Sequence, residues 1–167
     1  MATGIQVPVE EYLRMSFDGP DREYLDGEIV ERNVPENPHS KAQANLTGFF
    51  YVLAKKLPLH VRPELRMRVT PTRYRIADVA VWTGEEPTEN VPSHPPTIVI
   101  EILSREDRFA DILAKFEEYR SWGVKHVWFV DPWQRKIYVY SAAGLTEVPA
   151  FQIAKYPVEI PAAEVFR

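Results

Sequence analysis

The sequence predicts one α/β domain of the α+β type, in which a mixed β-sheet is flanked by helices. Its 167 residues are 45% hydrophobic and 26% charged, a composition that suits a globular domain with one sizeable core. Short apolar runs that are typical of buried strands alternate with longer stretches of helical periodicity. In the second half of the chain a helical stretch separates two such runs. Those two strands are therefore expected to be parallel, while the preceding strands read as antiparallel.

The first third of the chain is expected to form a helix, a hairpin and a second helix. Pro8–Met15 has a proline at an early position and acids in its first turn, which is typical of a helix start. Tyr24–Val30 reads as a hairpin, because Asp26-Gly27 suits a two-residue turn with positive φ. Asn37–Leu57 reads as a long helix whose apolar residues recur at helical spacing: Leu46, Phe49, Phe50, Leu53 and Leu57.

Two strands are expected after this helix, near residues 60–69 and 73–82. In the first of them Leu65, Met67 and Val69 alternate with charged residues, so one face of the strand is buried and the other is polar. The Pro- and Glu-rich stretch Thr83–Pro96 reads as a loop inside the domain and not as a domain boundary.

The expected crossover lies in the second half of the chain. It consists of the strand Thr97–Leu103, a helix from about Asp107 to Trp122 that Gly123 caps, and the strand His126–Asp131. Lys136–Tyr140 adds another strand. The tail after Gly144 is expected to form one more short strand and loosely ordered chain, so that residues 1–167 make a single domain.

Composition excludes several classes of function. The chain has no cysteine, which excludes disulfides, thiol catalysis and cysteine-bound zinc or iron–sulfur sites. No apolar run approaches the roughly 20 residues of a membrane span, and no secretion signal is visible, so a cytoplasmic protein is expected. The net charge of −4 gives no general attraction to nucleic acid, although it leaves room for a local basic surface.

Two acidic residues stand in runs that read as buried strands. Asp78 lies in the run 76–82 and Glu101 in the run 97–103. A carboxylate that loses its water must be compensated by hydrogen bonds, an opposite charge or a metal ion. Two such acids on strands close in sequence predict a site for Mg²⁺, with Mn²⁺ as the alternative ion, because hard cations prefer oxygen ligands. The other interpretation pairs each acid with an arginine or places it at a strand end.

Other residues could serve the same site. Lys115 lies at the margin of an apolar helix face formed by Phe109, Ile112, Leu113, Phe116 and Tyr119. From there its ammonium could reach a phosphate, or it could form an exposed i,i+4 pair with Asp111. Glu28 could be a further ligand of the metal or of a water, whereas acids near turns are also common at surfaces. His39 reads more simply as a surface residue, and Asp131 as a strand end.

Arginines are concentrated between Arg62 and Arg75, which hold five of them and the single acid Glu64. A basic strand edge beside an acidic pair would suit a phosphate backbone, and a solvated polar face is the other interpretation. Tyr74 and Trp82 could stack on bases, but aromatic residues in strands usually belong to the core.

Several of these residues together resemble a known family. The set consists of Asp78, the stretch 101–104, Asp111 to Tyr119, Trp122 to Val124, and Trp128 to Pro132, with the early stretch 26–30 and His39 in support. In this order it is similar to the Uma family of restriction-endonuclease-like proteins, which belongs to the PD-(D/E)XK nuclease superfamily. The resemblance runs from about residue 9 to 145, which leaves a short C-terminal extension.

The resemblance implies a mixed sheet with flanking helices and Mg²⁺-dependent hydrolysis of DNA phosphodiesters. It makes Asp78, Glu101 and the Ile102 carbonyl the metal ligands. Two positions depart from the superfamily signature, because Ala77 stands in place of its proline and Leu103 in place of its lysine. The family's lysine then lies on the following helix, which makes it Lys115, with Glu28 as a third acid of the catalytic set.

These expectations describe a DNA endonuclease that acts through metal-activated water, with a homodimer expected for cleavage of both strands. Two rivals remain open. One is a degenerate nuclease fold that acts as a non-enzymatic nucleic-acid-binding or regulatory module, which the absent lysine and the acidic pI favour. The other is an interaction protein without a role on nucleic acid, whose two acids are paired with arginines.

Overall fold

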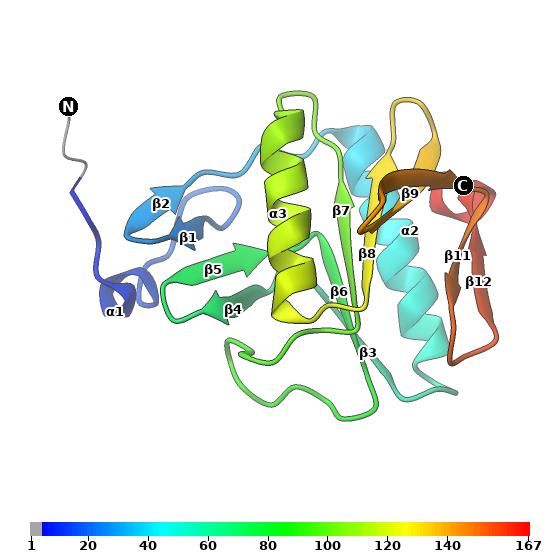
Figure 1. The fold of residues 1–167 in the computed structure, drawn as a ribbon, viewed down its shortest axis with the longest axis horizontal. Helices are drawn as coiled ribbons and strands as arrows, with labels where there is room; N and C mark the ends of the chain where they lie inside the picture. Colours follow the sequence, from blue (N-terminus) through cyan, green and yellow to red (C-terminus); the bar gives the residue numbers. More distant parts are fainter. Residues whose placement is uncertain (1–4) are drawn as a thin grey trace.

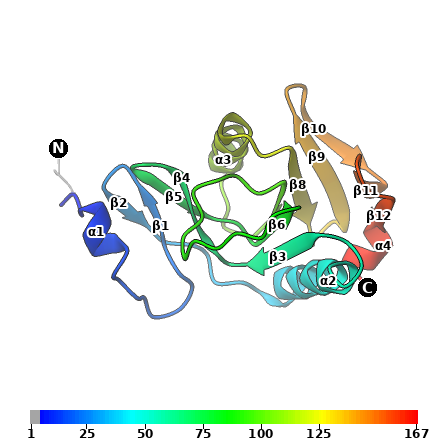
Figure 2. The ribbon, with the colours of Figure 1, turned by 90° about the horizontal axis from the view of Figure 1, so that it is seen from below.

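The computed structural model describes residues 5–167. Its centre is a six-stranded sheet with two helices on opposite faces, as Figures 1 and 2 show. The strands lie in the order β10-β9-β8-β7-β6-β3. Their bounds are β3 Leu59–Pro63, β6 Val79–Thr83, β7 Ile98–Ile102, β8 His126–Asp131, β9 Lys136–Ser141 and β10 Gly144–Val148. The predicted class, a mixed sheet flanked by helices, is confirmed.

The predicted crossover is present in this sheet. β7 and β8 pair in parallel, while each of the other neighbours pairs antiparallel. The connection between them is α3, Phe109–Trp122, which ends at Gly123 in the left-handed conformation with φ 113°. Glycine adopts this conformation without the steric cost that a Cβ brings.

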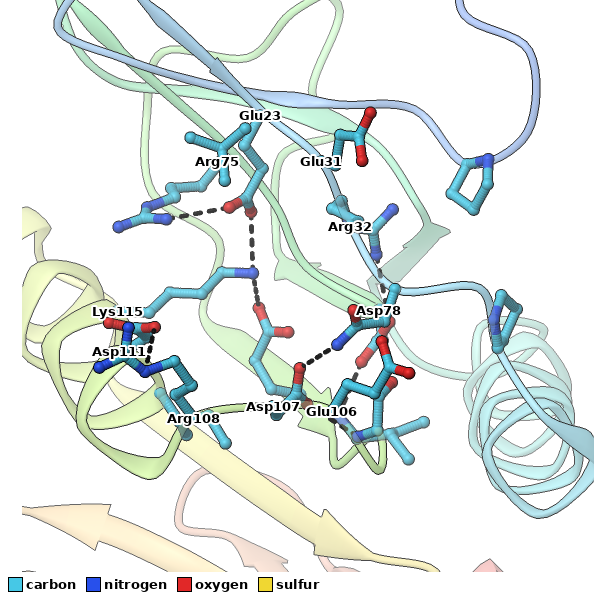
Figure 3. Close-up of a pocket in the computed structure, with 18 of the residues that line it drawn as sticks. Glu23, Glu31, Arg32, Arg75, Asp78, Glu106, Asp107, Arg108, Asp111 and Lys115 are labelled. Carbon is cyan, nitrogen blue, oxygen red and sulfur yellow. Dashed lines mark hydrogen bonds and ion pairs between the residues drawn. The ribbon is translucent and has the colours of Figure 1, made fainter. Parts of the chain in front are cut away.

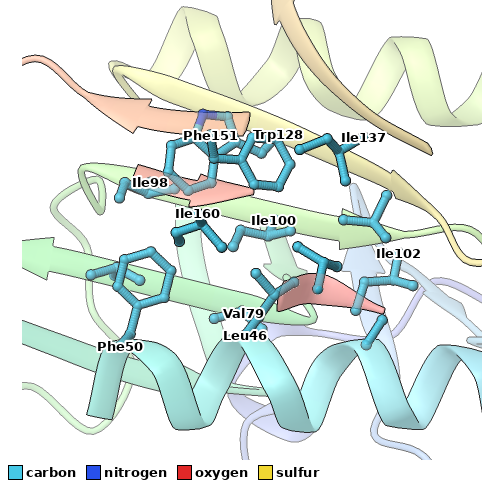
Figure 4. Close-up of a cluster of buried hydrophobic side chains, with 14 of the residues drawn as sticks. Leu46, Phe50, Val79, Ile98, Ile100, Ile102, Trp128, Ile137, Phe151 and Ile160 are labelled. Atoms are coloured by element: carbon cyan, nitrogen blue, oxygen red, sulfur yellow. The ribbon is translucent and has the colours of Figure 1, made fainter. Parts of the chain in front are cut away.

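Helix α2, Asn37–Leu53, covers the face opposite to α3 (Figure 2). Leu46 and Phe50 on its predicted apolar stripe are fully buried against β6, β7 and β8. Figure 4 shows both of these side chains beneath the strands, close to Val79 and Ile100. On the other face Phe116 and Tyr119 of α3 are fully buried, and their cluster includes core residues of β6, β7 and β8. The sheet therefore separates two apolar layers, one for each helix.

A second, smaller sheet packs beside the first. Its order is β2-β1-β5-β4, all antiparallel, and the short helix α1, Val9–Tyr12, lies against it. Its strands are β1 Glu23–Leu25, β2 Glu28–Val30, β4 Arg66–Thr70 and β5 Arg73–Ile76. The predicted hairpin turn is confirmed by positive φ at Asp26 (51°) and Gly27 (99°). Tyr12, Tyr24 and Tyr74 form a separate small core here.

The sequence predicted one continuous strand near 60–69 and another near 73–82, and both predictions are wrong. Each stretch is divided, and its two halves belong to different sheets. The first break falls at Glu64, whose φ of 55° turns the chain after Pro63. The second falls at Ala77 and Asp78, which are both buried but lie between β5 and β6. Asp78 therefore lies in the two-residue link between the sheets and not inside a strand.

The C-terminal tail is more ordered than predicted. It forms a hairpin of β11, Ala150–Ile153, and β12, Val158–Pro161, followed by the helix α4, Ala162–Val165. Phe151 stacks on Trp128 of the central sheet with 4.2 Å between ring centroids (Figure 4). The tail therefore completes the core on the α2 face. In the described part of the chain no helix is long and apolar enough to cross a membrane.

This packing leads to a prediction about stability. Phe151→Ala removes a fully buried ring, so we expect the free energy of unfolding to fall by about 3–5 kcal/mol. Phe109→Ala is the matched control, because Phe109 is 58% exposed at the start of α3, contrary to its predicted place in the helix core. Urea denaturation measures both variants. Equal losses would contradict the role given to the tail.

Candidate active site

A cavity of about 820 Å³ lies where the two sheets meet. It is lined by β1, by the chain between β2 and α2, by the end of β7 and by the first turns of α3. Figure 3 shows charged side chains of β1, of the chain before α2 and of α3 that point into one space. The lining holds eight carboxylates against five lysines and arginines. The cavity is therefore acidic, and cations are expected to enter it readily.

Asp78 and Glu101 both line this cavity. β6 and β7 pair antiparallel with Val79 opposite Ile100, so the next position in the same register sets Asp78 opposite Glu101. Residues directly opposite each other in antiparallel strands place their side chains on the same side of the sheet. The two acids that the sequence pattern singled out are thus brought together.

The carboxylate of Asp78 is buried and held by several groups. Its Oδ2 accepts a hydrogen bond from the Ile102 amide at 2.7 Å and lies 3.3 Å from His39 Nε2. Its Oδ1 accepts one from Arg32 Nη2 at 3.2 Å. Burial opposes ionisation, yet His39, Arg32 and the amide outweigh it and lower the pKa of Asp78. Asp78 is therefore an ionised carboxylate at neutral pH.

Glu101 is held through one of its two oxygens. Oε1 accepts a 2.7 Å hydrogen bond from the Tyr119 hydroxyl and lies 2.9 Å from Lys115 Nζ. Within residues 5–167, Oε2 accepts no hydrogen bond. Burial, with the charges of Asp78 and Glu23, outweighs Lys115 and raises the pKa of Glu101 to about 7. A second cation beside Oε2 would relieve the repulsion between these carboxylates.

Lys115 joins the two sheets. Its Nζ lies 2.8 Å from Glu23 Oε1 of β1 and 2.9 Å from Glu101 Oε1, and it donates to the Ile76 carbonyl at 3.1 Å. Figure 3 shows the lysine extending from α3 toward Glu23. These three acceptors match the three N–H donors of an ammonium. Burial disfavours the charge of Lys115, but Glu101 and Glu23 raise its pKa, so it is ionised.

Glu23 is fixed in turn by a buried ion network. Its Oε1 accepts the Ile76 amide at 2.9 Å, and its Oε2 accepts Arg75 Nη1 at 2.9 Å. Arg75 also pairs with Glu118 of α3 at 2.7 Å, and Glu118 pairs with Arg73 at 2.9 Å. This network ties the small sheet to α3, so the position of Lys115 depends on residues from three elements.

The structure does not bring every predicted residue to the cavity. Glu28 is exposed on β2 and is not among the lining residues, whereas Glu23 on the paired strand is. His39, interpreted as a surface residue, is 4% exposed and faces Asp78. Ile102 lines the cavity, as predicted for a ligand that follows Glu101. Asp131 accepts the amides of the turn that follows it, in agreement with its simpler interpretation.

The arginine-rich stretch is mostly engaged within the protein. Four of its five arginines form ion pairs, with Glu86, Asp21, Asp26, Glu118 and Glu23 as partners: Arg62, Arg66, Arg73 and Arg75. Tyr74 and Trp82 are buried in the core and present no face for stacking on bases. The interpretation of this segment as a basic surface for DNA therefore loses most of its support.

Sequence reasoning missed three residues that shape the site. Glu23 lies in a three-residue strand, and Arg32 lies in the linker that follows the hairpin. Gln43 of α2 donates to the Asp78 carbonyl at 2.9 Å and to Glu64 at 2.8 Å. Arg32 also pairs with Glu64, so this acid is shared by both donors. Gln43 is half-buried on α2, and its position beside the apolar stripe was the available signal.

The residues present fit one divalent cation. No cluster of three or more His, Cys, Asp or Glu side chains suited to a metal exists in the described chain. Mg²⁺, however, is usually held by one or two carboxylates, with waters and substrate phosphate as the other ligands. Asp78, Oε2 of Glu101 and the Ile102 carbonyl would supply oxygen ligands of this kind at one end of the sheet.

The ion network leads to a prediction about pH. Burial raises the pKa of Glu23, but Lys115, Arg75 and the Ile76 amide outweigh it and lower that pKa from 4.5 to about 2. A lowered pKa stabilises the fold above the unfolded value, and this contribution is lost as the pH falls toward 2. Glu23→Gln should therefore reduce the free energy of unfolding at pH 7 by roughly 3 kcal/mol.

The difference from the wild-type protein should shrink between pH 7 and pH 3.5 in urea denaturation. Glu28→Gln is the matched control, since it makes the same substitution at an exposed position of the same hairpin. A Glu23→Gln difference that stays constant with pH would contradict the ionised state of Glu23.

Comparisons with known proteins agree with this architecture. A crystal structure described as "a putative nuclease belonging to DUF820 from Anabaena variabilis ATCC 29413" superposes with a TM-score of 0.80. The two chains are 19% identical, and the match covers 96% of this chain and 97% of the other. At this identity the likeness establishes the fold. A search of curated proteins finds no match.

The family assignment comes from the sequence itself. The family model Uma2, described as "Putative restriction endonuclease", matches residues 9–161. This range holds both sheets, α2, α3 and every residue that lines the cavity. The resemblance seen in the sequence is confirmed, and the chain belongs to the Uma2 family.

Proposed function

We propose that this protein is a Mg²⁺-dependent DNA endonuclease that hydrolyses phosphodiester bonds. One observation carries the proposal: Asp78 and Glu101 meet where β6 begins and β7 ends, beside Lys115, in a cavity of about 820 Å³. The family supports the reaction class, because its description names an endonuclease. Manganese is the alternative metal, and the proposed setting is a cytoplasmic homodimer in which each site cuts one strand.

The side chains take distinct roles in this proposal. Asp78, Glu101 and the Ile102 carbonyl would hold the cation, which would lower the pKa of a bound water and offset charge on the leaving oxygen. Lys115 and Tyr119 fix Glu101 through Oε1 and so direct Oε2 into the cavity. Glu23 keeps Lys115 in place. The ammonium would reach a phosphate only by exchanging one of its three acceptors.

Arg32 and His39 hold the carboxylate of Asp78. Both contact its carboxylate and balance its charge in a buried position. A cation at Asp78 would balance part of the negative charge that Arg32 and His39 now balance. Metal binding would therefore compete with the contact between Arg32 and Asp78. Arg32 would then be available for the negative charge of a phosphate, which a guanidinium binds well.

A second function has one observation in its favour. Both oxygens of Asp78 are already engaged, and all three donors of Lys115 have acceptors. A site compensated in this way could be structural. The chain would then be a non-enzymatic nucleic-acid-binding or regulatory module on a nuclease fold.

Substitution of the two acids separates these functions. Asp78→Asn or Glu101→Gln should lower the rate of DNA cleavage in Mg²⁺ at least about 100-fold, because each removes charge that holds the cation. Calorimetry should show a matching loss of Mg²⁺ or Mn²⁺ binding. Asp111→Asn, an exposed acid on the cavity rim, is the control and should retain cleavage.

Cleavage that survives both substitutions would contradict the proposed site. Salt-dependent DNA binding without cleavage under Mg²⁺ and Mn²⁺ would select the binding module instead. Wild-type protein that binds neither metal nor DNA at low salt would remove both functions.

A further inference from the structure

A second cavity of about 350 Å³ adjoins the first. It lies between the linker before α2, the loop after β7 and the turn after β8. The two cavities share part of their lining: Asn33, Pro35, His39, Ser104 and Glu106. Its size is at the lower end of the range for ligand pockets, so it suits one small flat group and not a large ligand.

Two buried polar atoms of residues that line this cavity have no hydrogen-bond partner in the described chain. His39 Nδ1 and Trp133 Nε1 are buried, and neither makes a hydrogen bond to any residue that the structure describes. His39 as a whole is 4% exposed, and its other ring nitrogen faces Asp78 in the first cavity. Buried polar atoms are nearly always hydrogen-bonded, so a ligand or a water is expected to satisfy these two.

The walls of the cavity favour a flat, uncharged ligand. Val34 and Pro35 supply an apolar side, and the ring of Trp133 supplies an aromatic face. The guanidinium of Arg105 already stacks on that ring, 4.2 Å from its centroid. Glu36 and Glu106 place two carboxylates against this single cation, which makes the cavity unfavourable for a phosphate.

We propose that this cavity binds one nucleobase of the nucleic-acid chain, next to the phosphate that is cut. The base would take the place of the guanidinium on Trp133, and the 63%-exposed Arg105 side chain would close over its outer face. A base stacked on the Trp133 ring cannot reach Nε1, which lies in the plane of that ring. Its edge would instead hydrogen-bond to His39 Nδ1 after a small movement of the buried imidazole. Stacking does not depend on sequence, because every base has a π-face. This inference rests on the proposed nuclease function and adds the way in which the enzyme holds its substrate.

Such a site requires a base that can leave its stack. A base held in a cavity cannot remain paired, so the substrate class is a single strand, a strand end or a duplex from which the base is turned out.

Binding to matched oligonucleotides tests the inference without cleavage. Asp78→Asn protein would be titrated with a labelled single-stranded oligonucleotide and with an abasic chain of the same length, by fluorescence anisotropy. We expect the abasic chain to bind roughly tenfold to a hundredfold more weakly. Adding Trp133→Ala should remove most of this difference. Phe109→Ala, an exposed aromatic residue outside both cavities, should leave it unchanged.

The inference is overturned if Trp133→Ala leaves the preference for the base-bearing chain over the abasic chain unchanged. A buried water would then be the partner of the two ring nitrogens. Arg105→Ala provides a second variant if Trp133→Ala does not fold. Arg105 is exposed, and its loss should reduce the preference severalfold because the base would lose one stacking partner.

Active protein gives an independent readout. In an oligonucleotide with one abasic residue, cuts at one fixed distance from that residue should be depleted about tenfold, and Trp133→Ala should restore an even pattern. An even pattern from wild-type protein would overturn the nucleobase site while the nuclease function stands. The absence of any cut would instead contradict the function on which the site rests.

Discussion

The contact of Lys115 with two carboxylates is the interaction on which the arrangement of the site depends. Glu23 belongs to the small sheet and Glu101 to the large one, and the ammonium of α3 lies within 2.9 Å of both. Without a cation between them, two buried carboxylates would repel each other and draw in water. The lysine therefore holds the two sheets together at the point where the cavity opens.

The contact of Lys115 with Glu101 explains why the lysine can come from helix α3. In the superfamily signature the lysine lies on the same strand as the glutamate. Leu103, at the signature position, packs with the apolar residues under α3, whereas Lys115 approaches Glu101 from above the sheet. Tyr119, one turn further along the helix, bonds to the same oxygen of Glu101. Because Oε1 receives both donors, Oε2 has no hydrogen bond to the described residues. An acidic cavity with a directed carboxylate is what a cation requires, and the proposed reaction follows from that arrangement.

Much of the fold could be predicted from local patterns. The crossover around α3, its glycine cap and the Asp26-Gly27 turn each have a local signature, and the pairing of Asp78 with Glu101 follows from their burial. The divided strands could not be read in the same way. Ala77 and Asp78 carry no glycine or proline to mark the change of sheet, although Pro63 was a signal for the first break. Glu23 and His39 were missed because their roles come from residues far along the chain, which no local pattern encodes.

Soaking crystals with Mn²⁺ and collecting anomalous diffraction tests the central claim most directly. The account predicts one Mn²⁺ in contact with Asp78 and with Oε2 of Glu101, while Lys115 stays on Oε1 and Arg32 releases Asp78. A structure without an anomalous peak at this place, with Arg32 and His39 still on the Asp78 carboxylate at saturating Mn²⁺, would contradict it.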